Sequence, residues 1–307
     1  MKPLTQLIVF LLFFTQATAA LAAEGFSLKE VADGVYVHQG VHKDLDENYN
    51  GDIANIGFIV GSKGVAVVDT GGSLKIGKQL RDAVKKVTTL PILYVINTHV
   101  HPDHIFGNAA FLQDKPQFIG HEKLGNAMAL RKDTYMRINQ EWLGQDFEGS
   151  EIVQPTMTVK DNLTLDLGSR TLEIKAYPTA HTNTDITVLD SKTGTLWTGD
   201  LLFVERTPSI DGDIKSWLSV IQNLKALPAK KVVPGHGPVV DGSSNAFANE
   251  ERYLSTLLND VRNSIKKGEP MERAMETAAV SEKDHWQLFN TVNRRNVNQI
   301  YPALEWE

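Results

Sequence analysis

The chain has 307 residues, of which 42% are hydrophobic and 22% are charged, and its formal net charge is −6. That composition is typical of a globular protein, and a mildly acidic surface disfavours a nucleic-acid partner. Because the sequence contains no cysteine, disulfides are excluded, and any metal must be held by nitrogen and oxygen ligands.

Residues 1–22 have the pattern of a secretory signal peptide. Lys2 precedes an apolar run over residues 7–14, and Ala20-Leu21-Ala22 fits an A-x-A cleavage site. The apolar run is far shorter than the roughly 20 residues that span a membrane. We therefore expect an exported protein without a membrane anchor, whose single domain covers residues 23–307 and ends in a helical extension.

Strand and helix patterns alternate in the first half of the mature chain. Residues 35–37, 56–60 and 65–69 predict strands, and the last two are expected to form a hairpin. Ser73 is the expected N-cap of a helix that continues to Val87 and is ended by Pro91. A buried strand over 92–96 follows, so the next segment leaves the C-terminal end of a strand, where sites are usually built.

The second half continues the same alternation. Its predicted elements, in chain order, are a short strand at 118–119, a helix from about 121 to 142, hairpins pairing 163–167 with 171–177 and 186–190 with 195–197, a helix over 213–227, a strand over 230–233, and helices from 245 onward broken at 268–270. Hairpins interleaved with helices in both halves predict a layered α/β fold in which helices cover mixed sheets.

The segment after the 92–96 strand, NTHVHPDHIFGNAAF, concentrates metal-binding side chains. Imidazole and carboxylate groups are the usual protein ligands of zinc when no cysteine is present. Its four candidate ligands are His99, His101, Asp103 and His104. Three further candidates, His181, Asp200 and His236, each follow another predicted strand. We expect the strand-end loops to lie along one sheet edge and to bring these side chains together.

This ordered set resembles the metallo-β-lactamase fold superfamily: His-x-His-x-Asp-His, a lone His, an Asp after Gly, and a His in Pro-Gly-His-Gly. The resemblance implies a four-layer αββα sandwich with two zinc ions at one edge. It assigns His99, His101 and His181 to the first zinc, Asp103, His104 and His236 to the second, and Asp200 to a bridge between them. The implied nucleophile is a hydroxide shared by the two metals, and Asp103 is expected to orient this hydroxide or to shuttle a proton.

Other polar residues are assigned roles outside the set of metal ligands. Asp69, at the end of VAVVD, is expected to orient a motif histidine, although an ordinary turn role is the alternative. His38 and His42 lie in HQGVH, which in the family often forms a flap over the site, and a solvated loop is the alternative there. His121, at the start of a helix, and His285, in the helical tail, are interpreted as structural.

Departures from family patterns reduce the number of activities that the resemblance allows. Asp200 occupies a position where β-lactamases of this fold often have Cys or Ser, which makes that activity less favoured. HQGVH, GDIANIGFIVG, INTHVHPDHIFGNAAF and RRNVNQIYPALEWE are most similar to the quinoprotein relay system zinc metallohydrolases. That likeness implies a periplasmic hydrolase of a small-molecule substrate that works beside a PQQ quinoprotein or cytochrome c system. A glyoxalase II-like thioesterase, a lactonase and a non-catalytic metal-binding accessory protein remain alternatives.

Overall fold

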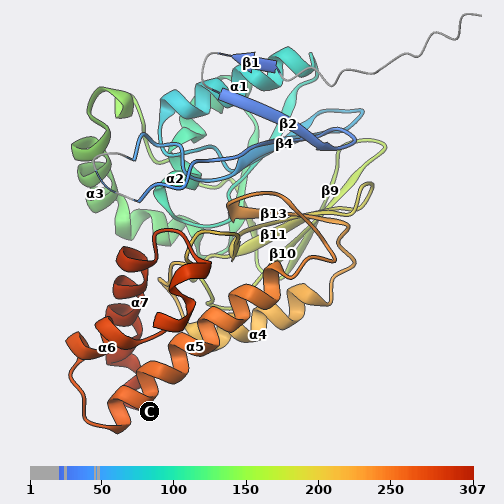
Figure 1. The fold of residues 1–307 in the computed structure, drawn as a ribbon. Coiled ribbons are helices and arrows are strands. Elements are labelled where there is room, and N and C mark those ends of the chain that lie inside the picture. The colour runs from blue at the N-terminus through green and yellow to red at the C-terminus, as the bar shows by residue number, and fades with distance from the viewer. Residues whose placement is uncertain (1–20, 24–25, 45, 47–48) are drawn as a thin grey trace, which may run out of the picture.

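The computed structural model describes residues 21–23, 26–44, 46 and 49–307 (Figure 1). The predicted signal peptide lies outside the described residues except for Leu21 and Ala22, which belong to the short strand β1 (Leu21–Ala23). Among the described residues, no helix combines the length and the apolar character that crossing a membrane requires.

The N-terminal half builds an eight-stranded mixed sheet whose strands lie side by side in chain order. From β1 to β5 neighbouring strands are antiparallel, and from β5 to β8 they are parallel. After β1 its strands are β2 (Phe26–Ala32), β3 (Val35–His38), β4 (Ile56–Val60), β5 (Val65–Val68), β6 (Ile92–Ile96), β7 (Gln117–His121) and β8 (Met157–Val159).

The C-terminal half builds a six-stranded sheet in the order β14-β13-β12-β11-β10-β9. Only β12 and β13 are parallel; the other pairs are antiparallel. The strands are β9 (Asn162–Asp166), β10 (Thr171–Ala176), β11 (Ile186–Asp190), β12 (Thr195–Phe203), β13 (Lys231–His236) and β14 (Val240–Asp241).

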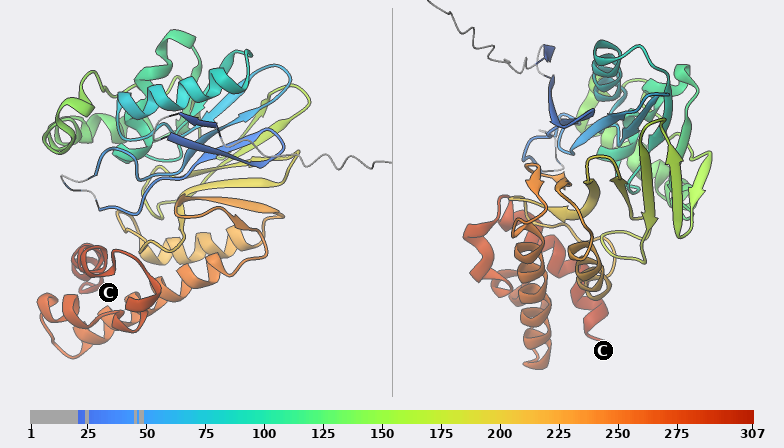
Figure 2. Two further views of the ribbon diagram at one scale, coloured as in Figure 1. Left: turned by 45° about the horizontal axis from the view of Figure 1, so that its top comes forward. Right: turned by 90° about the vertical axis from the view of Figure 1, so that its right-hand side faces the viewer.

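Helices cover the outer faces of both sheets (Figure 2). Helix α1 packs its buried Ile76, Leu80 and Val84 against the first sheet, while α4 and α5 pack against the second. The α-helices are α1 (Leu74–Val87), α2 (Pro102–Ile105), α3 (Leu124–Leu143), α4 (Ile214–Lys225), α5 (Ala246–Lys266), α6 (Met271–Thr277) and α7 (Phe289–Leu304). The 3-10 helices are η1 (Phe106–Asp114), η2 (Gly144–Phe147) and η3 (Val280–His285).

A core of buried aliphatic side chains joins the inner faces of the two sheets. Val68 and Ile96 of the first sheet belong to the same cluster as Ile174, Val188 and Trp197 of the second. Burying one face of each sheet in a shared core, and the other under helices, gives four layers. The predicted αββα sandwich is therefore confirmed.

Most element predictions hold, but the places of several candidate residues need correction. The side chain of Ser73 caps α1 by accepting a hydrogen bond from Ile76 N, as expected. Asp200 and His236, however, do not follow their strands but lie within β12 and at the end of β13. His121 ends strand β7 instead of opening a helix, and its Nδ1 accepts a hydrogen bond from Lys123 N.

Candidate metal centre

The structure brings all the predicted ligands together in two adjoining clusters. In each cluster the potential ligand atoms lie within 4.8 Å of one another. The first cluster consists of His99, His101, His181 and Asp200, and the second of Asp103, His104 and His236. This division is the one that the family resemblance implied, although their roles as ligands stay a prediction.

Both sheets contribute to the centre. His99 and His101 follow β6 of the first sheet, and α2 then carries Asp103 and His104. The second sheet supplies the rest, from the loop after β10 and from β12 and β13. Asn55 fixes the two halves together, because its amide donates to Pro234 O at 2.8 Å and Gly237 O at 2.7 Å, on either side of His236.

Glycine allows the close approach of strands at the centre. A Cβ added to Gly235 would lie 1.9 Å from Asp200 Oδ1 and 2.7 Å from the carbonyl carbon of Gly199. Any side chain at this position would therefore displace β13 or the Asp200 carboxylate. The Pro-Gly-His-Gly motif thus has a steric reason for its first glycine, since it lets β13 lie against Asp200.

Each histidine ring is oriented by a contact on the nitrogen that faces away from the centre. This arrangement fixes the ring position and tautomer of metal-binding histidines. The pairs are His99 Nδ1 with Thr98 Oγ1 at 3.0 Å, His101 Nε2 with Asp211 Oδ2 at 3.2 Å, His104 Nδ1 with Asp69 Oδ2 at 2.8 Å, His181 Nδ1 with Ser209 O at 2.7 Å, and His236 Nδ1 with Ile53 O at 2.7 Å.

The carboxylate of Asp200 lies between the two clusters. Its Oδ2 is 3.3 Å from Nε2 of both His181 and His236, and its Oδ1 is 3.2 Å from His104 Nε2. Burial alone raises the pKa of Asp200, but the charges of the surrounding histidines outweigh burial and hold this pKa well below its usual range. Asp200 is therefore placed to offer an ionised oxygen to each cluster.

Three buried ligand atoms at the centre form no hydrogen bond. Among the described residues these are His99 Nε2, His104 Nε2 and Asp200 Oδ1, although the last two lie within ion-pair distance of each other. Leaving such atoms buried and unsatisfied is costly, so they normally meet a ligand. Imidazole and carboxylate groups converging in this way fit a dinuclear metal site.

Asp69 contacts His104 of the His-x-His-x-Asp-His segment and Thr98, which directly precedes that segment. Besides contacting His104, its carboxylate accepts hydrogen bonds from Thr98 N at 2.8 Å and Thr98 Oγ1 at 2.7 Å. Its backbone has a φ of 53°, a left-handed conformation that Asp tolerates better than most residues. The contact with a motif histidine is the one expected from sequence.

The two flap candidates lie in different surroundings. His38 is buried at the end of β3, where its Nδ1 contacts Ser27 O and its Nε2 contacts Asp52 Oδ1, both at 2.7 Å. Both ring nitrogens are thus engaged within the fold, which leaves neither for a substrate. His42 Nε2 lies 3.6 Å from Glu205 Oε2, and burial lowers the pKa of His42.

Sequence reasoning missed Asp211, which orients His101. Its Oδ2 also lies 3.4 Å from Arg131 Nη2. Burial alone raises the pKa of Asp211, but its hydrogen bond and charge interaction with His101 outweigh burial and bring this pKa to about 2. Asp211 stands two residues before the N-cap Asp213 of α4, and no sequence signal separated it from an ordinary loop residue.

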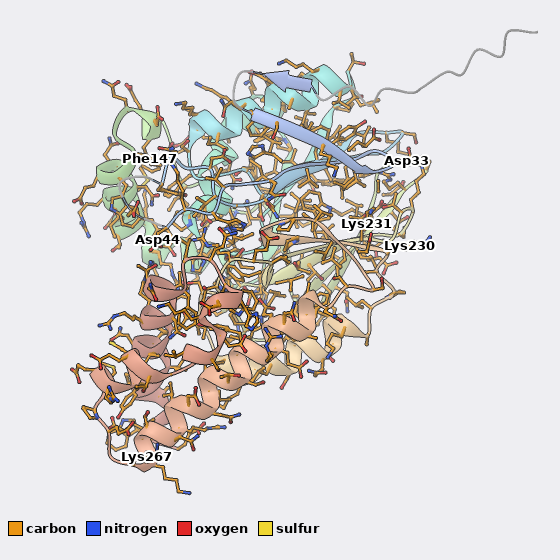
Figure 3. All side chains as sticks on the ribbon, in the orientation of Figure 1. Asp33, Asp44, Phe147, Lys230, Lys231 and Lys267 are labelled. Atoms are coloured by element: carbon orange, nitrogen blue, oxygen red, sulfur yellow. The ribbon has the colours of Figure 1, made fainter. Side chains whose placement is uncertain are left out.

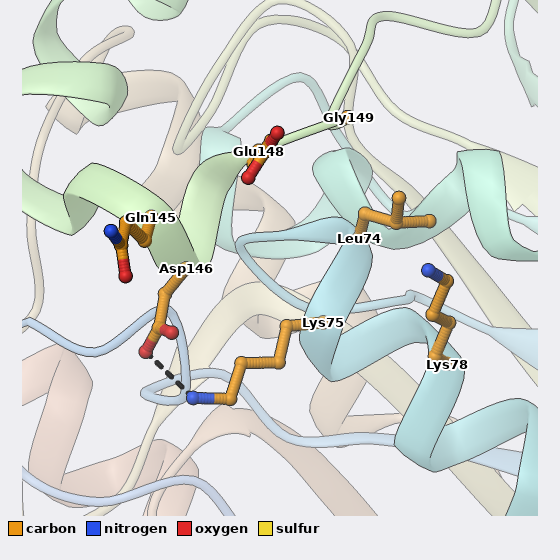
Figure 4. Close-up of a pocket in the computed structure, with 7 residues that line it drawn as sticks. All are labelled: Leu74, Lys75, Lys78, Gln145, Asp146, Glu148 and Gly149. Atoms are coloured by element: carbon orange, nitrogen blue, oxygen red, sulfur yellow. Dashed lines mark hydrogen bonds and ion pairs between the residues drawn. The ribbon is translucent and has the colours of Figure 1, made fainter.

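A cavity of about 320 Å³ opens onto the centre. Its residues at the centre are His101, Asp103, Asp200 and His236. A second hollow, between α1 and η2, contains none of the predicted ligands and is bordered by an ion pair of 2.7 Å between Lys75 and Asp146 (Figure 4). The cavity at the centre is therefore the candidate substrate site.

Comparisons with known proteins agree with this geometry. The human acyl-coenzyme A thioesterase MBLAC2 is 25% identical over 263 residues, covering 76% of this chain and 88% of that protein. A metallo-beta-lactamase from Pontibacter korlensis has a TM-score of 0.60 at 23% identity, covering 75% of this chain and 99% of that one. The sec-alkylsulfatase Pisa1 from Pseudomonas sp. has a TM-score of 0.69 at 16% identity, covering 90% of this chain and 50% of that one.

The family model for the metallo-beta-lactamase superfamily matches residues 49–236. This span begins just before the Asn55 bridge, includes all the residues of both clusters, and ends on His236. The two solved structures share the arrangement of sheets and helices seen here. On this match and this fold, the chain belongs to the metallo-beta-lactamase superfamily.

Proposed function

We propose that the chain is a dinuclear zinc hydrolase that cleaves an ester-like bond. The observation that carries this proposal is the convergence of two ligand clusters on one cavity, with three buried ligand atoms that form no hydrogen bond within the described residues. His99, His101 and His181 are proposed to hold one zinc ion, Asp103, His104 and His236 the second, and Asp200 to bridge them. Two zinc ions bound there would supply hydroxide at neutral pH and polarise the substrate oxygen.

The protein's own residues have distinct tasks in this reaction. Asp103 lines the cavity, and its Oδ2 lies 3.4 Å from His236 Nε2. From this position its carboxylate is proposed to orient the attacking water and to accept a proton. The contacts of Asp69 and Asp211 keep His104 and His101 in place, so that the donor atoms need no rearrangement when substrate binds.

An ester or thioester is the proposed scissile group. The relative MBLAC2, which is 25% identical, is named as an acyl-coenzyme A thioesterase, and this name supports a glyoxalase II-like thioesterase as one alternative. A lactonase is another. Asp200 makes a β-lactamase less favoured. A non-catalytic metal-binding accessory protein is the remaining alternative.

We also propose that the protein is exported and works beside a PQQ quinoprotein system in the periplasm. The support is the signal pattern of residues 1–22 and the likeness of the motif segments to quinoprotein relay metallohydrolases. Intact-mass analysis of a periplasmic fraction should give an N-terminus near Ala23. A full-length chain confined to the cytoplasm would reject both the export and the quinoprotein context.

A substrate panel tests the hydrolase proposal. Purified protein with measured metal content should hydrolyse at least one ester, thioester or lactone faster than a β-lactam. Chelation should abolish this activity, and added zinc should restore it. If protein with two bound metals hydrolyses no class in the panel, the accessory-protein alternative replaces the hydrolase.

A further inference from the structure

An asparagine–glycine pair lies in a left-handed turn of the segment that joins β3 to β4. Asn50 has a φ of 57° and Gly51 a φ of 74°, a conformation that these two residue types tolerate best. Asn50 is exposed to solvent, whereas Tyr49 and Gly51 on either side of it are buried. The pair is the only Asn-Gly dipeptide in the chain. The turn therefore presents one asparagine amide to water between two buried neighbours.

An asparagine that precedes glycine can react with its own main chain without a catalyst. Gly51 N gives its proton to water and attacks Cγ of Asn50, so that an N–Cγ bond forms. The Cγ–Nδ2 bond then breaks, and ammonia leaves after taking up a proton from water. A second water opens the resulting five-membered imide. Opening at Cγ gives aspartate, whereas opening at the main-chain carbonyl gives isoaspartate, in which the main chain is one atom longer.

Two features of the turn favour attack by Gly51 N. Among the described residues, this nitrogen donates no hydrogen bond to a backbone carbonyl, so no such bond has to break before it reacts. Glycine also leaves the nitrogen unshielded. Any side chain at this position would be strained at a φ of 74°, and its Cβ would lie 3.3 Å from Ser73 Oγ. The turn thus requires the residue type that allows the reaction.

The segment that contains the turn also supports the metal centre. Three residues after Asn50, Ile53 O accepts a hydrogen bond from His236 Nδ1 at 2.7 Å. Earlier in the same segment, Asp44 forms an ion pair with Arg295 of α7 (Figure 3). An atom added to the main chain at Asn50 falls between these two anchors. It therefore works against the position of Ile53 O and against the hydrogen bond that orients His236.

We propose that Asn50 deamidates spontaneously and that isoaspartate at this position weakens metal binding by His236. The modification follows from the turn alone. Its effect on zinc rests on the proposed function, in which His236 holds the second ion. Loss of the group that orients a metal-binding histidine lowers metal affinity about 10–100-fold. The product is a folded chain that loses mainly the zinc bound by Asp103, His104 and His236.

Asn55, a few residues further on, provides the contrast within the same segment. It is 2% exposed, and its Nδ2 donates hydrogen bonds to Pro234 O at 2.8 Å and to Gly237 O at 2.7 Å. The β-branched Ile56 follows it and shields the next main-chain nitrogen. Cyclisation would break both buried hydrogen bonds, which is costly. We therefore expect Asn55 to stay intact while Asn50 reacts.

Peptide mapping provides the first test. Purified protein of measured metal content is kept at physiological temperature and mildly alkaline pH, and samples are digested with trypsin at intervals. Residues 44–63 form one tryptic peptide that contains both Asn50 and Asn55. Fragmentation should place the amide-to-acid mass gain at Asn50 and not at Asn55, and an isoaspartate-specific methyltransferase should label the product. Conversion at Asn50 no faster than at Asn55 overturns the proposal.

Variants provide the second test, with zinc affinity measured by graded chelators. Asn50→Gly tolerates the turn and has no amide to lose. The isoaspartate form of incubated wild type, separated by ion exchange, should bind zinc at the His236 cluster about tenfold or more weakly than fresh protein, whereas incubated Asn50→Gly should not change. Asn50→Asp adds the charge without lengthening the main chain, so it should bind zinc like wild type when fresh. A fresh Asp variant as weak as the isoaspartate form would overturn the role of the added atom.

The mass and metal measurements separate this inference from the proposed function. Isoaspartate at Asn50 with unchanged zinc affinity overturns the effect on the metal centre. Fresh wild type that binds no zinc rejects the proposed function and that effect with it, while peptide mapping still decides the modification. If Asn50→Gly fails to fold, the comparison of fresh wild type with its isoaspartate form decides the effect without it.

Discussion

Asp200 is the residue on which the proposed chemistry depends most. Its two oxygens face histidines of both clusters, so Asp200→Ser removes a charge and a ligand from each. We expect kcat to fall about a hundredfold or more, corresponding to ~2–4 kcal/mol for one preorganised electrostatic group. Asp241→Ser, at an exposed carboxylate on β14, is the control. Unchanged turnover with two metals still bound would reduce Asp200 to a structural role.

Asp69 is not a proposed metal ligand but contacts the proposed ligand His104. Replacing it with Asn preserves its size but weakens the acceptor that holds His104 and Thr98. We expect metal affinity at the His104 cluster to fall about 10–100-fold, while the other cluster changes less. Competition with a graded series of chelators measures both affinities. Identical affinities in wild type and variant would show that the His104 ring is held by other contacts.

At this scale, local spacing carried most of the predictive information. His99 to His104 are close in sequence, and each later ligand stands in a short motif beside Gly, Pro or Thr. Asp211 was not predictable, because its role arises from folding. It meets His101 across 110 positions of the sequence.

At the scale of the elements, helix α1 and the 3-10 helix η1, which directly follows α2 and its His104, meet at two glycines, Gly77 and Gly107. A Cβ on Gly77 of α1 would lie 2.3 Å from Gly107 O. Gly77→Ala should lower the free energy of unfolding by ~1–3 kcal/mol through overpacking, and weaken metal binding at the His104 cluster. Gly125→Ala is the control, because it meets only the flexible side chain of Gln154 at this range. Denaturant titration of metal-loaded protein measures the free energy of unfolding of each variant. A Gly77→Ala variant as stable as wild type would show that the contact between α1 and η1 is not tight.

Helix α5 contributes a buried acid that should make stability depend on pH. Glu250 Oε1 accepts a hydrogen bond from Phe203 N of β12 at 2.9 Å, yet burial raises the pKa of Glu250 well above its usual value. A raised folded-state pKa gives stability that is full below the unfolded pKa of about 4.3. That stability is lost as pH rises toward the folded pKa, at up to ~1.4 kcal/mol per pH unit.

Glu250→Gln keeps the acceptor for Phe203 N and removes the titration. The unfolding free energy of wild type should therefore fall relative to the variant as pH rises from about 4 to 8. Urea titrations of both proteins across this range measure the difference. Parallel curves would show that Glu250 ionises in the folded protein as easily as in the unfolded one.

Strand lengths were the least predictable feature of the elements. The Thr198-Gly199-Asp200 segment has a turn-like sequence, so the strand was expected to end at Trp197. In the structure all nine residues of β12 are buried, because Leu201, Leu202 and Phe203 continue into the core under α4 and α5. Tertiary burial outweighed the local turn preference. Helix α1 was predictable because its cap and apolar spacing agree.

Across the whole molecule, the centre joins two sheets that the chain builds separately. Ligands from both halves meet there, and Asn55 adds direct hydrogen bonds between them. A metal that binds only the folded arrangement adds its binding free energy to the stability of the fold. The layered fold was predictable from alternating hairpins and helices. The position of α7, which lines the cavity with Val292 and Asn296, was not, because helical periodicity does not show where a helix docks.

The central claim is that these residues hold two zinc ions, and metal analysis tests it most directly. Protein purified without chelator is analysed by elemental mass spectrometry, with circular dichroism to verify the fold. The account predicts about two zinc ions per chain, with His181→Ala emptying mainly one site and His104→Ala mainly the other. A folded protein with a stoichiometry near zero, even after incubation with zinc, would contradict it.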